Sequence, residues 1–310
     1  MLKMYAALKN NPGEIVKAAA RHRLINFARY MQPDLALEPF HVVYYTLLDK
    51  FAHGEIKKMI VQMPPQHGKS EGSSRKLPAF MLGLNPDTKI CIGSYAATIA
   101  RDFNRDVQRI IDTPKYREIF PKTFLNGSNV VTMANTYLRN SDVIEMVGHK
   151  GSLRVVGRGG ALTSKTVDVM IMDDVYKDYS EGNSPIVRNA AWKWYTTVVK
   201  KRLHNKSQEL IVFTRWHEED LIGKIEKGGE KIIDIKSWDS IKNIPDGAWV
   251  RINFEALKTG EPNEIDPREP GAALWESMHS RAKLERERAL DPIQFQCLDQ
   301  GNPGSAEGRL

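Results

Sequence analysis

The chain has 310 residues, of which 41% are hydrophobic and 27% charged, and this composition is typical of a globular protein rather than of a disordered or fibrous one. No apolar run approaches the roughly 18 residues of a transmembrane helix, and the first residues lack the continuous apolar segment of a secretory signal. The formal net charge of +7 permits a polyanionic partner without predicting one. Cys91 and Cys297 are far apart in the sequence, and Cys91 lies in an apolar run, so we expect free thiols and a reducing cytosol.

The hydrophobic pattern predicts helices first and then an alternation of strands and helices. Apolar residues recur at helical spacing in residues 1–55. Beyond them, each predicted strand is largely apolar, which indicates a mostly parallel sheet covered by helices on both faces. From residue 228 the sequence is rich in proline, glycine and charge. We expect strands at 57–63, 88–95, 141–148, 152–160, 166–174 and 207–214, and helices at 69–83, 96–112, 184–205, 218–228 and 280–298.

The segment MPPQHGKS, residues 63–70, lies where a predicted strand ends and a predicted helix begins. It matches the phosphate-binding pattern G-x-x-x-x-G-K-[ST], except that Met63 takes the place of the first glycine. Lys69 could contact the β- and γ-phosphates of a nucleotide, and the Ser70 hydroxyl could bind Mg²⁺. A surface turn is the alternative. The backbone N–H groups that could hold the anion are those of Gln66, His67, Gly68, Lys69 and Ser70.

Two carboxylates, Asp173 and Asp174, follow the apolar strand predicted at 166–174. In a P-loop ATPase the first carboxylate of such a pair holds Mg²⁺, and the second orients and deprotonates the attacking water. Many motor ATPases have Glu at the second position, and the shorter Asp must lie closer to the water. Carboxylates that cap the next helix are the alternative, which the phosphate-binding pattern earlier in the chain disfavours.

A third polar strand end, Thr214-Arg215, follows the strand predicted at 207–214. The carboxyl ends of parallel strands meet at one edge of a sheet. Thr214 could therefore hydrogen-bond to the γ-phosphate or to the attacking water, and Arg215 could contact phosphate or pair with an acid. The next residues, HEED at 217–220, lack the spacing of metal ligands, and we expect them to form an acidic first turn of a helix.

Taken in order, these pieces resemble the ATPase domain of tailed-phage large terminase subunits, over about residues 35–310. The resemblance rests on the segments EPFHVVYYTLLDKFAHGEIKKMIVQMPPQHGKS, GRGGALTSKTVDVMIMDDVYKD, FTRWHEEDLIGKI and REPGAALWESMHS. It implies an α/β P-loop NTPase fold of the ASCE type, with a mostly parallel central sheet flanked by helices and a small lid subdomain. The expected parts are an N-terminal helical region (1–55), the ATPase core (56–227), the lid (228–296) and a linker (297–310) toward a nuclease domain outside this chain.

The resemblance also implies roles for individual residues. Phe40 and His41 fall where the family often has an adenine-recognising residue, although an ordinary amphipathic helix face explains them equally well. The implied Walker A, Walker B, catalytic and coupling positions are Lys69, Ser70, Asp173, Asp174 and Thr214.

The phosphate loop departs from its relatives at one position. Related loops often carry Arg just before His-Gly-Lys-Ser, where this chain has Gln66. Another cation must therefore stabilise the charge of the transferring phosphate. Arg158 and Lys165 are candidates for delivery from a neighbouring subunit. Three further candidates, each also explained as an ordinary surface cation, are Arg75, Arg101 and Arg105.

The residues predict an ATP hydrolase that uses ATP and Mg²⁺, and the resemblance implies that it translocates double-stranded DNA into a procapsid. The resemblance implies a portal protein and a small terminase subunit as partners, a homo-oligomeric ring, no membrane, and the cytoplasm of the infected bacterial host, with transient residence at the procapsid portal. The helix predicted at 184–205 ends in KKRLHNK, which could contact DNA phosphates or simply complement the helix dipole.

Two other functions stay open at this point. The first is a helicase-like DNA-dependent ATPase, and the second is a nucleotide-binding module without turnover. We find no remaining acidic cluster suited to two metal ions, so we do not expect this chain to cut DNA.

Overall fold

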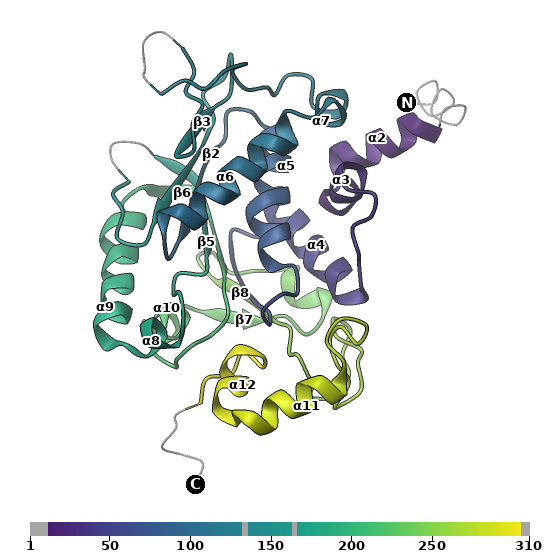
Figure 1. The fold of residues 1–310 in the computed structure, drawn as a ribbon, viewed down its shortest axis with the longest axis vertical. Helices are drawn as coiled ribbons and strands as arrows, with labels where there is room; N and C mark the ends of the chain where they lie inside the picture. Colours follow the sequence, from purple (N-terminus) through teal and green to yellow (C-terminus); the bar gives the residue numbers. More distant parts are fainter. Residues whose placement is uncertain (1–11, 132–135, 163–165, 305–310) are drawn as a thin grey trace.

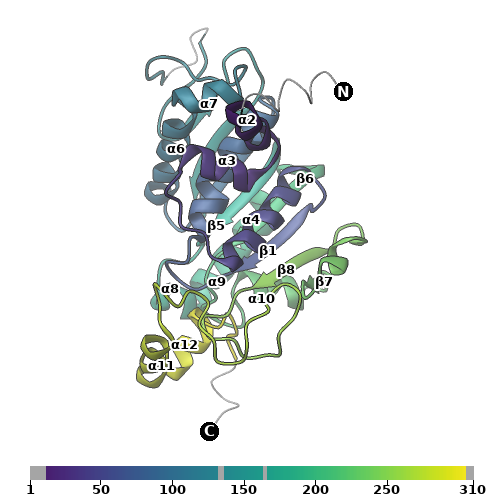
Figure 2. The ribbon, with the colours of Figure 1, turned by 90° about the vertical axis from the view of Figure 1, so that its right-hand side faces the viewer.

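The computed structural model describes residues 12–131, 136–162 and 166–304. Their centre is an eight-stranded sheet in the order β3-β4-β2-β5-β6-β1-β8-β7 (Figures 1 and 2). Neighbouring strands are parallel except for the antiparallel pair β3 and β4, so the expected, mostly parallel sheet is confirmed. The strands are β1 (Lys58–Gln62), β2 (Lys89–Ser94), β3 (Val143–Glu145), β4 (Ser152–Gly157), β5 (Val167–Asp173), β6 (Leu203–Val212), β7 (Ile232–Asp234) and β8 (Trp249–Asn253).

Helices cover both faces of the sheet, since alternate residues of each strand point to opposite sides. Met59 and Val61 of β1 belong to one buried cluster, and Ile60 belongs to the other. None of the described helices is long and apolar enough to cross a membrane. The helical segments are α2 (Pro12–His22), α3 (Leu24–Met31), α4 (Pro39–Ala52), η1 (Glu71–Lys76), α5 (Leu77–Leu84), α6 (Ala97–Ile111), α7 (Pro114–Ile119), α8 (Tyr179–Asn183), α9 (Pro185–Trp194), η2 (Tyr195–Val199), α10 (Leu221–Lys227), η3 (Trp238–Ile241), α11 (Arg281–Leu290) and α12 (Pro292–Leu298).

The helix predicted at 184–205 is too long. Its helical part, α9 followed by η2, ends at Val199, and β6 begins at Leu203. Leu203 pairs with Val167 of β5, so strand pairing inside the sheet overrides the local helical pattern. The basic segment KKRLHNK is therefore not a helix end.

That basic segment borders a cavity of about 640 Å³. The cavity lies where β1 and β6 begin, which is the edge of the sheet opposite the phosphate loop. Its basic lining residues are Lys57, Lys58, Lys200 and His204.

The helix predicted at 280–298 is interrupted. Asp291 separates α11 from α12 and has an extended conformation, with φ −146° and ψ 87°. The residue before a proline is disfavoured in a helix, and Pro292 follows. The Asp291 carboxylate then caps α12, because it accepts a hydrogen bond of 2.9 Å from the backbone N–H of Gln294.

The segment expected to form a lid contributes two strands to the central sheet. β8 pairs with β1, and β7 adds to its outer side. Beyond β8 the chain leads to α11 and α12, which lie together at one end of the molecule (yellow in Figures 1 and 2). The parallel sheet thus continues to Asn253.

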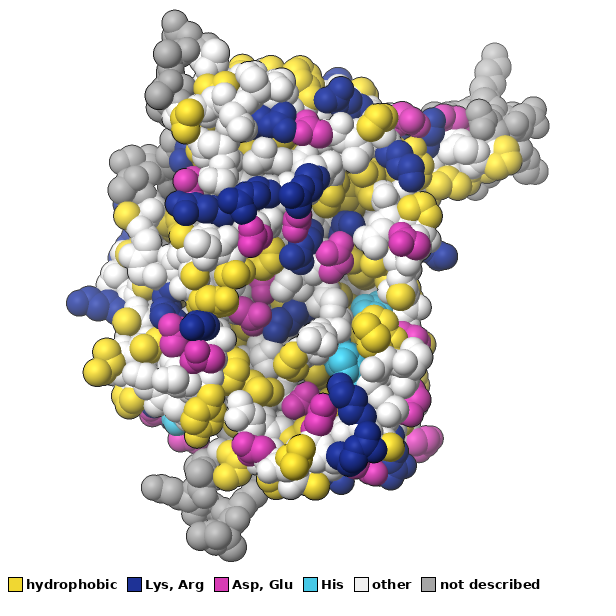
Figure 3. All heavy atoms as spheres, viewed as in Figure 1, with side chains coloured by type: hydrophobic (Ala, Val, Ile, Leu, Met, Phe, Trp, Pro, Cys, Tyr) yellow, Lys and Arg dark blue, Asp and Glu magenta, His cyan; other side chains and the backbone are white. Residues whose placement is uncertain are grey.

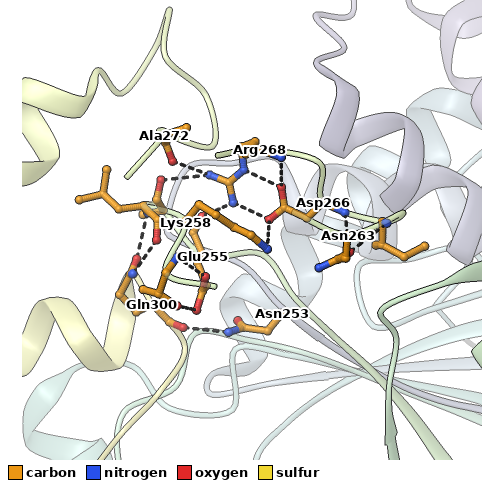
Figure 4. A network of polar contacts seen from close by, with 12 residues as sticks. Asn253, Glu255, Lys258, Asn263, Asp266, Arg268, Ala272 and Gln300 are labelled. Atoms are coloured by element: carbon orange, nitrogen blue, oxygen red, sulfur yellow. Dashed lines mark hydrogen bonds and ion pairs between the residues drawn. The ribbon is translucent and has the colours of Figure 1, made fainter. Parts of the chain in front are cut away.

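A polar network fixes the segment that follows β8 (Figure 4). Arg268 donates two hydrogen bonds of 2.8 Å to Asp266 and further bonds to the carbonyls of Glu255 and Ala272. Lys258 lies 3.3 Å from the same Asp266 carboxylate. Planar guanidinium–carboxylate pairs of this kind hold geometry well, so the segment has a defined shape without regular secondary structure.

The chain after α12 is attached to the carboxyl ends of two strands. Asn253, the last residue of β8, donates to the Gln300 carbonyl at 2.8 Å. Gln62, the last residue of β1, donates to the Gly301 carbonyl at 2.9 Å. The phosphate loop begins at the next residue after Gln62, so the C-terminal segment is bonded directly beside it.

Candidate active site

The phosphate loop connects β1 to η1 through two residues in the left-handed region. Gln66 has φ 60° and Gly68 has φ 83°. A Cβ added at Gly68 would come within 3.3 Å of the His41 Nε2 atom, so both the backbone angle and the space favour glycine there. Met63, which stands where the phosphate-binding pattern has its first glycine, is 2% exposed and packs in the hydrophobic core.

Helix α4 supports this loop from below. His41 accepts a hydrogen bond at Nδ1 from the Glu38 backbone N–H, and its Nε2–H therefore donates to the His67 carbonyl at 3.2 Å. The Tyr44 hydroxyl donates to the Lys69 carbonyl. Phe40 is 6% exposed and packs near the rings of His67 and Trp275. Base recognition by Phe40 and His41 stays a prediction, because the contacts of both residues are with the loop and its surroundings.

Lys69 joins the three strand ends that the sequence singled out. Its ammonium lies 2.5 Å from the Thr214 hydroxyl and 3.1 Å from the Asp174 carboxylate. Lys69 and Thr214 are both buried. The carboxyl ends of β1, β5 and β6 therefore bring a cation, a carboxylate and a hydroxyl into direct contact.

Asp173 lies below this contact, at the end of β5. It is fully buried, and the Ser70 hydroxyl donates to it at 3.0 Å. Burial, and after it the charge of Asp174, raises the pKa of Asp173 to about 7. A divalent cation would favour the ionised carboxylate, and the hydroxyl and carboxylate oxygens here are ligands that Mg²⁺ prefers. Ser70 and Asp173 therefore fit the predicted metal.

Asp174 has an unusual backbone conformation for a residue that is not glycine, with φ 46°. Its N–H donates to the Val212 carbonyl at 3.1 Å, and its own carbonyl accepts from the Tyr95 N–H at 2.8 Å. The Ser94 hydroxyl donates to the same carbonyl at 3.3 Å. The ends of β2 and β6 thus hold the strained residue in place, at a conformational cost of about 1–3 kcal/mol.

Arg215 forms a buried ion pair. Its Nε donates to Asp220 at 2.6 Å, and both side chains are almost completely buried. Asp220 is also the N-cap of α10, since it accepts from the Gly223 N–H at 3.1 Å. Helix α10 begins only at Leu221, so the expected acidic first helical turn is wrong: Glu218 and Glu219 precede the helix. Phosphate contact by Arg215 stays a prediction.

The candidate cations have partners where the structure describes them. Arg158 lies beside the end of β5, where it donates to the Val175 carbonyl at 2.6 Å and to Glu181 at 2.9 Å. Lys165 lies outside the described residues. The other pairs are Arg75 with Asp106 at 2.7 Å, Arg101 with Asp142 at 2.7 Å and Arg105 with Asp102 at 2.5 Å.

The comparisons with known proteins agree with this geometry. The family described as "Terminase large subunit, T4likevirus-type, N-terminal" matches residues 60–283, which include the phosphate loop and all three strand ends.

The chain belongs to this terminase large subunit family.

Solved structures of terminase large subunits share the fold. The large terminase of bacteriophage HK97 matches with a TM-score of 0.53 and 14% identity, over 91% of this chain and 55% of that one. The R139A mutant of the Thermus phage P74-26 large terminase ATPase domain matches with a TM-score of 0.52 and 14% identity, over 88% of this chain and 96% of that one. This chain thus spans little more than half of the HK97 protein. No curated protein sequence matches it significantly.

Several residues at this terminase site were missed by the sequence analysis. Ser74 donates to Asp173, and Ser73 donates to the Lys69 carbonyl at 2.8 Å. The spacing of these serines from Ser70 does not predict the contacts, because residues 71–76 form a π-helix rather than an α-helix. Trp275 and His279 pack against His67, and no local pattern predicts that contact.

Proposed function

We propose that this chain binds and hydrolyses ATP with Mg²⁺ and that it is the ATPase motor of a terminase large subunit that moves double-stranded DNA into a procapsid. The observation that carries the proposal is the contact of Lys69 with both Asp174 and Thr214 at the ends of three strands. A phosphate-binding lysine, a catalytic carboxylate and a hydroxyl on the intervening strand are the parts that ATP hydrolysis needs in this fold.

Each residue of the site has a proposed part in the reaction. The backbone N–H groups of the loop would hold the phosphates, and Lys69 would leave Asp174 to contact them. Asp174, thus freed, would accept the proton of the attacking water. Ser70 and Asp173 would hold Mg²⁺, which supplies positive charge to the β- and γ-phosphates. Thr214 would link the state of the γ-phosphate to β6.

The other parts of the proposal concern the whole assembly. The proposed partners are duplex DNA, a portal protein and a small terminase subunit. The chain would work as a ring of copies on the procapsid, in the cytoplasm of the host. Since β7 and β8 extend the sheet, we place the lid after Asn253 rather than at residue 228.

The test is ATP turnover with and without duplex DNA, for the wild type, Lys69→Ala and Asp174→Ala. We expect each substitution to lower turnover by at least about 100-fold, because it removes a group that stabilises the transition state. A wild type no faster than both variants would reject hydrolysis and leave a nucleotide-binding module. The assay should span protein concentration, since a cation from a neighbouring copy would act only after assembly.

Two further assays separate the remaining alternatives. Movement along intact duplex supports packaging, whereas strand separation would support a helicase-like enzyme instead. We also propose that this chain does not cut DNA, and nicking of supercoiled plasmid with Mg²⁺ or Mn²⁺ would contradict that.

A further inference from the structure

We propose that Lys283, in the first turn of α11, supplies within the same chain the positive charge that the phosphate loop lacks, by contacting the phosphates of bound ATP. The proposal rests on the proposed ATPase function and names a residue that neither the family match nor the sequence motifs assign to this site. It answers the question raised by Gln66, where a cation is expected and an amide is present.

The arginines near the loop are held by other groups. Arg215 is buried against Asp220, and Arg268 is fixed by Asp266 and three backbone carbonyls. Arg158 bonds to Glu181 and to a backbone carbonyl, and its side chain is only 14% exposed. Moving any of them would leave a buried carboxylate or carbonyl without its donor, which costs about 1–3 kcal/mol per group.

Residues 275–283 lie directly against the phosphate loop. The His279 ring stacks on the His67 ring with centroids 4.5 Å apart and planes 21° apart. Trp275 packs edge-on against His41 at 4.9 Å and lies 6.0 Å from His67. Figure 3 shows the corresponding surface, where histidine side chains lie beside Lys and Arg side chains over α11. These contacts bring the start of α11 to the loop in a defined position.

Lys283 extends from this stack. Its ammonium donates to His279 Nδ1 at 3.1 Å. An acceptor nitrogen requires His279 to be neutral, in agreement with its pKa, which burial and the charge of Lys283 lower. The hydrogen bond therefore aims the lysine without neutralising its charge.

A cavity of about 350 Å³ separates Lys283 from the loop. One side of the cavity is formed by Pro65, Gln66 and His67 of the loop, and the other side by side chains of α11 and α12. Among the described residues that line it, Lys283 is the one lysine or arginine. The stacked rings of His67 and His279 lie beside this cavity, with their Nε2 atoms buried.

The carboxylates of the same cavity do not hold Lys283 firmly. Its nearest acid is Glu287 at 3.4 Å, and both side chains are 43% exposed. Such a pair, four residues apart on a helix surface, contributes only about 0.3–0.5 kcal/mol. Asp291 is occupied as the cap of α12. Burial, and after it the charge of Glu287, raises the pKa of Asp299 to about 6, while the charge of Lys283 lowers it, so Asp299 is mostly ionised at neutral pH. A flexible lysine can therefore exchange Glu287 for a phosphate at little cost.

The test compares Lys283→Met, Lys283→Arg and the wild type, with Arg286→Met as the matched control. Arg286 is exposed on the same helix, and its substitution removes the same charge. We expect Lys283→Met to weaken binding of a fluorescent ATP analogue about 10-fold, to weaken ADP binding less, and to lower kcat, because a charged hydrogen bond to phosphate is lost. Lys283→Arg should restore most of the ATP-analogue affinity and of kcat, and Arg286→Met should change neither the affinity nor kcat.

The outcomes separate this proposal from the proposed function. A wild type without turnover rejects the function itself. A wild type that turns over, together with Lys283→Met unchanged in binding and kcat, rejects only the role of Lys283. An equal loss for ATP and ADP with a lowered Tm also rejects it, since that pattern indicates damage to the fold.

A mixing experiment tests whether the lysine acts within its own chain. Lys69→Ala and Lys283→Met are combined in equal amounts. A lysine delivered from a neighbour would restore activity, because each Lys69→Ala copy could serve a Lys283→Met site. We expect no restoration, and recovery of turnover would contradict action within one chain.

Discussion

Asp174 combines a catalytic position with a backbone conformation that most side chains avoid. Its φ of 46° is tolerated by Asp and Asn, which reach the left-handed region more readily than other residues apart from glycine. Backbone hydrogen bonds from the ends of β2 and β6 fix the residue there. The carboxylate is thereby directed at Lys69 by strands rather than by a loop.

The substitutions Asp174→Asn and Asp174→Ala should separate the effect of this residue on turnover from its effect on the free energy of unfolding. We expect Asp174→Asn to lower turnover by about 100-fold or more while the free energy of unfolding changes little, since Asn accepts the same backbone angles. Asp174→Ala should lose similar activity and a further 1 kcal/mol or so of stability, because alanine is strained there. Denaturant titrations of the two variants check this, and equal stabilities would contradict the strain.

Sequence could predict which residues meet at the site, but not how they are held. Lys69, Asp174 and Thr214 each follow an apolar strand, which predicts that they lie at one end of the sheet, and the structure places the three together. The positive φ of Asp174 depends on partners in two other strands. The contact of Ser74 with Asp173 depends on the π-helical start of η1, which turns Ser74 inward.

At the scale of elements, three buried histidines connect α4, the phosphate loop and the start of α11. Burial lowers the pKa of His41, His67 and His279, and for His67 the value falls to about 4. All three rings are therefore neutral at neutral pH. Charges that face them include Lys283 and Arg268, which disfavour protonation, and Glu38, which favours it.

This cluster predicts a dependence of stability on pH. The unfolded state has ordinary histidines, with a pKa of about 6.5, and binds more protons than the folded state. The stabilising contribution should be complete above about pH 6.5 and should be lost as the pH falls toward 4. Denaturant unfolding of the wild type and of His67→Gln between pH 7.5 and 4.5 measures how the free energy of unfolding depends on pH. We expect a shallower slope for His67→Gln, whereas the exposed-site control His22→Gln should keep the wild-type slope.

The misjudged helices show why element boundaries needed the structure. The segment 184–205 has helical periodicity, but from Leu203 onward it forms a strand that pairs with β5. The local sequence does not predict that pairing. The break at Asp291-Pro292 was readable from the proline alone. Local chemistry thus explains one boundary, although the sequence analysis expected an unbroken helix there, and long-range strand pairing determines the other.

At the scale of the whole molecule, charge is distributed over opposite ends of the sheet. The carboxyl edge carries the proposed ATP site, and the amino edge carries the basic cavity beside KKRLHNK. A row of basic side chains also crosses the face in Figure 3. On α6, Arg101, Arg105 and Arg109 are each paired with an aspartate. The lysines that line the cavity are paired too, Lys58 with Glu230 and Lys200 with Glu209, whereas the side chains of Lys201 and Lys206 in the adjoining KKRLHNK segment are exposed.

The exposed lysines of KKRLHNK, beside the basic cavity, therefore predict a site of duplex DNA contact. We expect Lys201→Gln with Lys206→Gln to weaken DNA binding similarly for all sequences, and to reduce the dependence of log K on log salt by about one unit per lost contact. Lys122→Gln with Lys150→Gln removes the same charge elsewhere and serves as the control. If both pairs of substitutions weakened DNA binding equally, the effect would come from net charge alone and the predicted site would be rejected.

The attachment of Gly301 to Gln62 has a mechanical consequence. Tension on the chain beyond Gly301 would act on the residue from which the phosphate loop starts. Load and nucleotide affinity must then be reciprocally linked, because any coupling free energy between two sites works in both directions. Pulling the protein from its C-terminal end in an optical trap should show an unfolding force that depends on bound nucleotide, and Gln62→Ala should reduce that dependence.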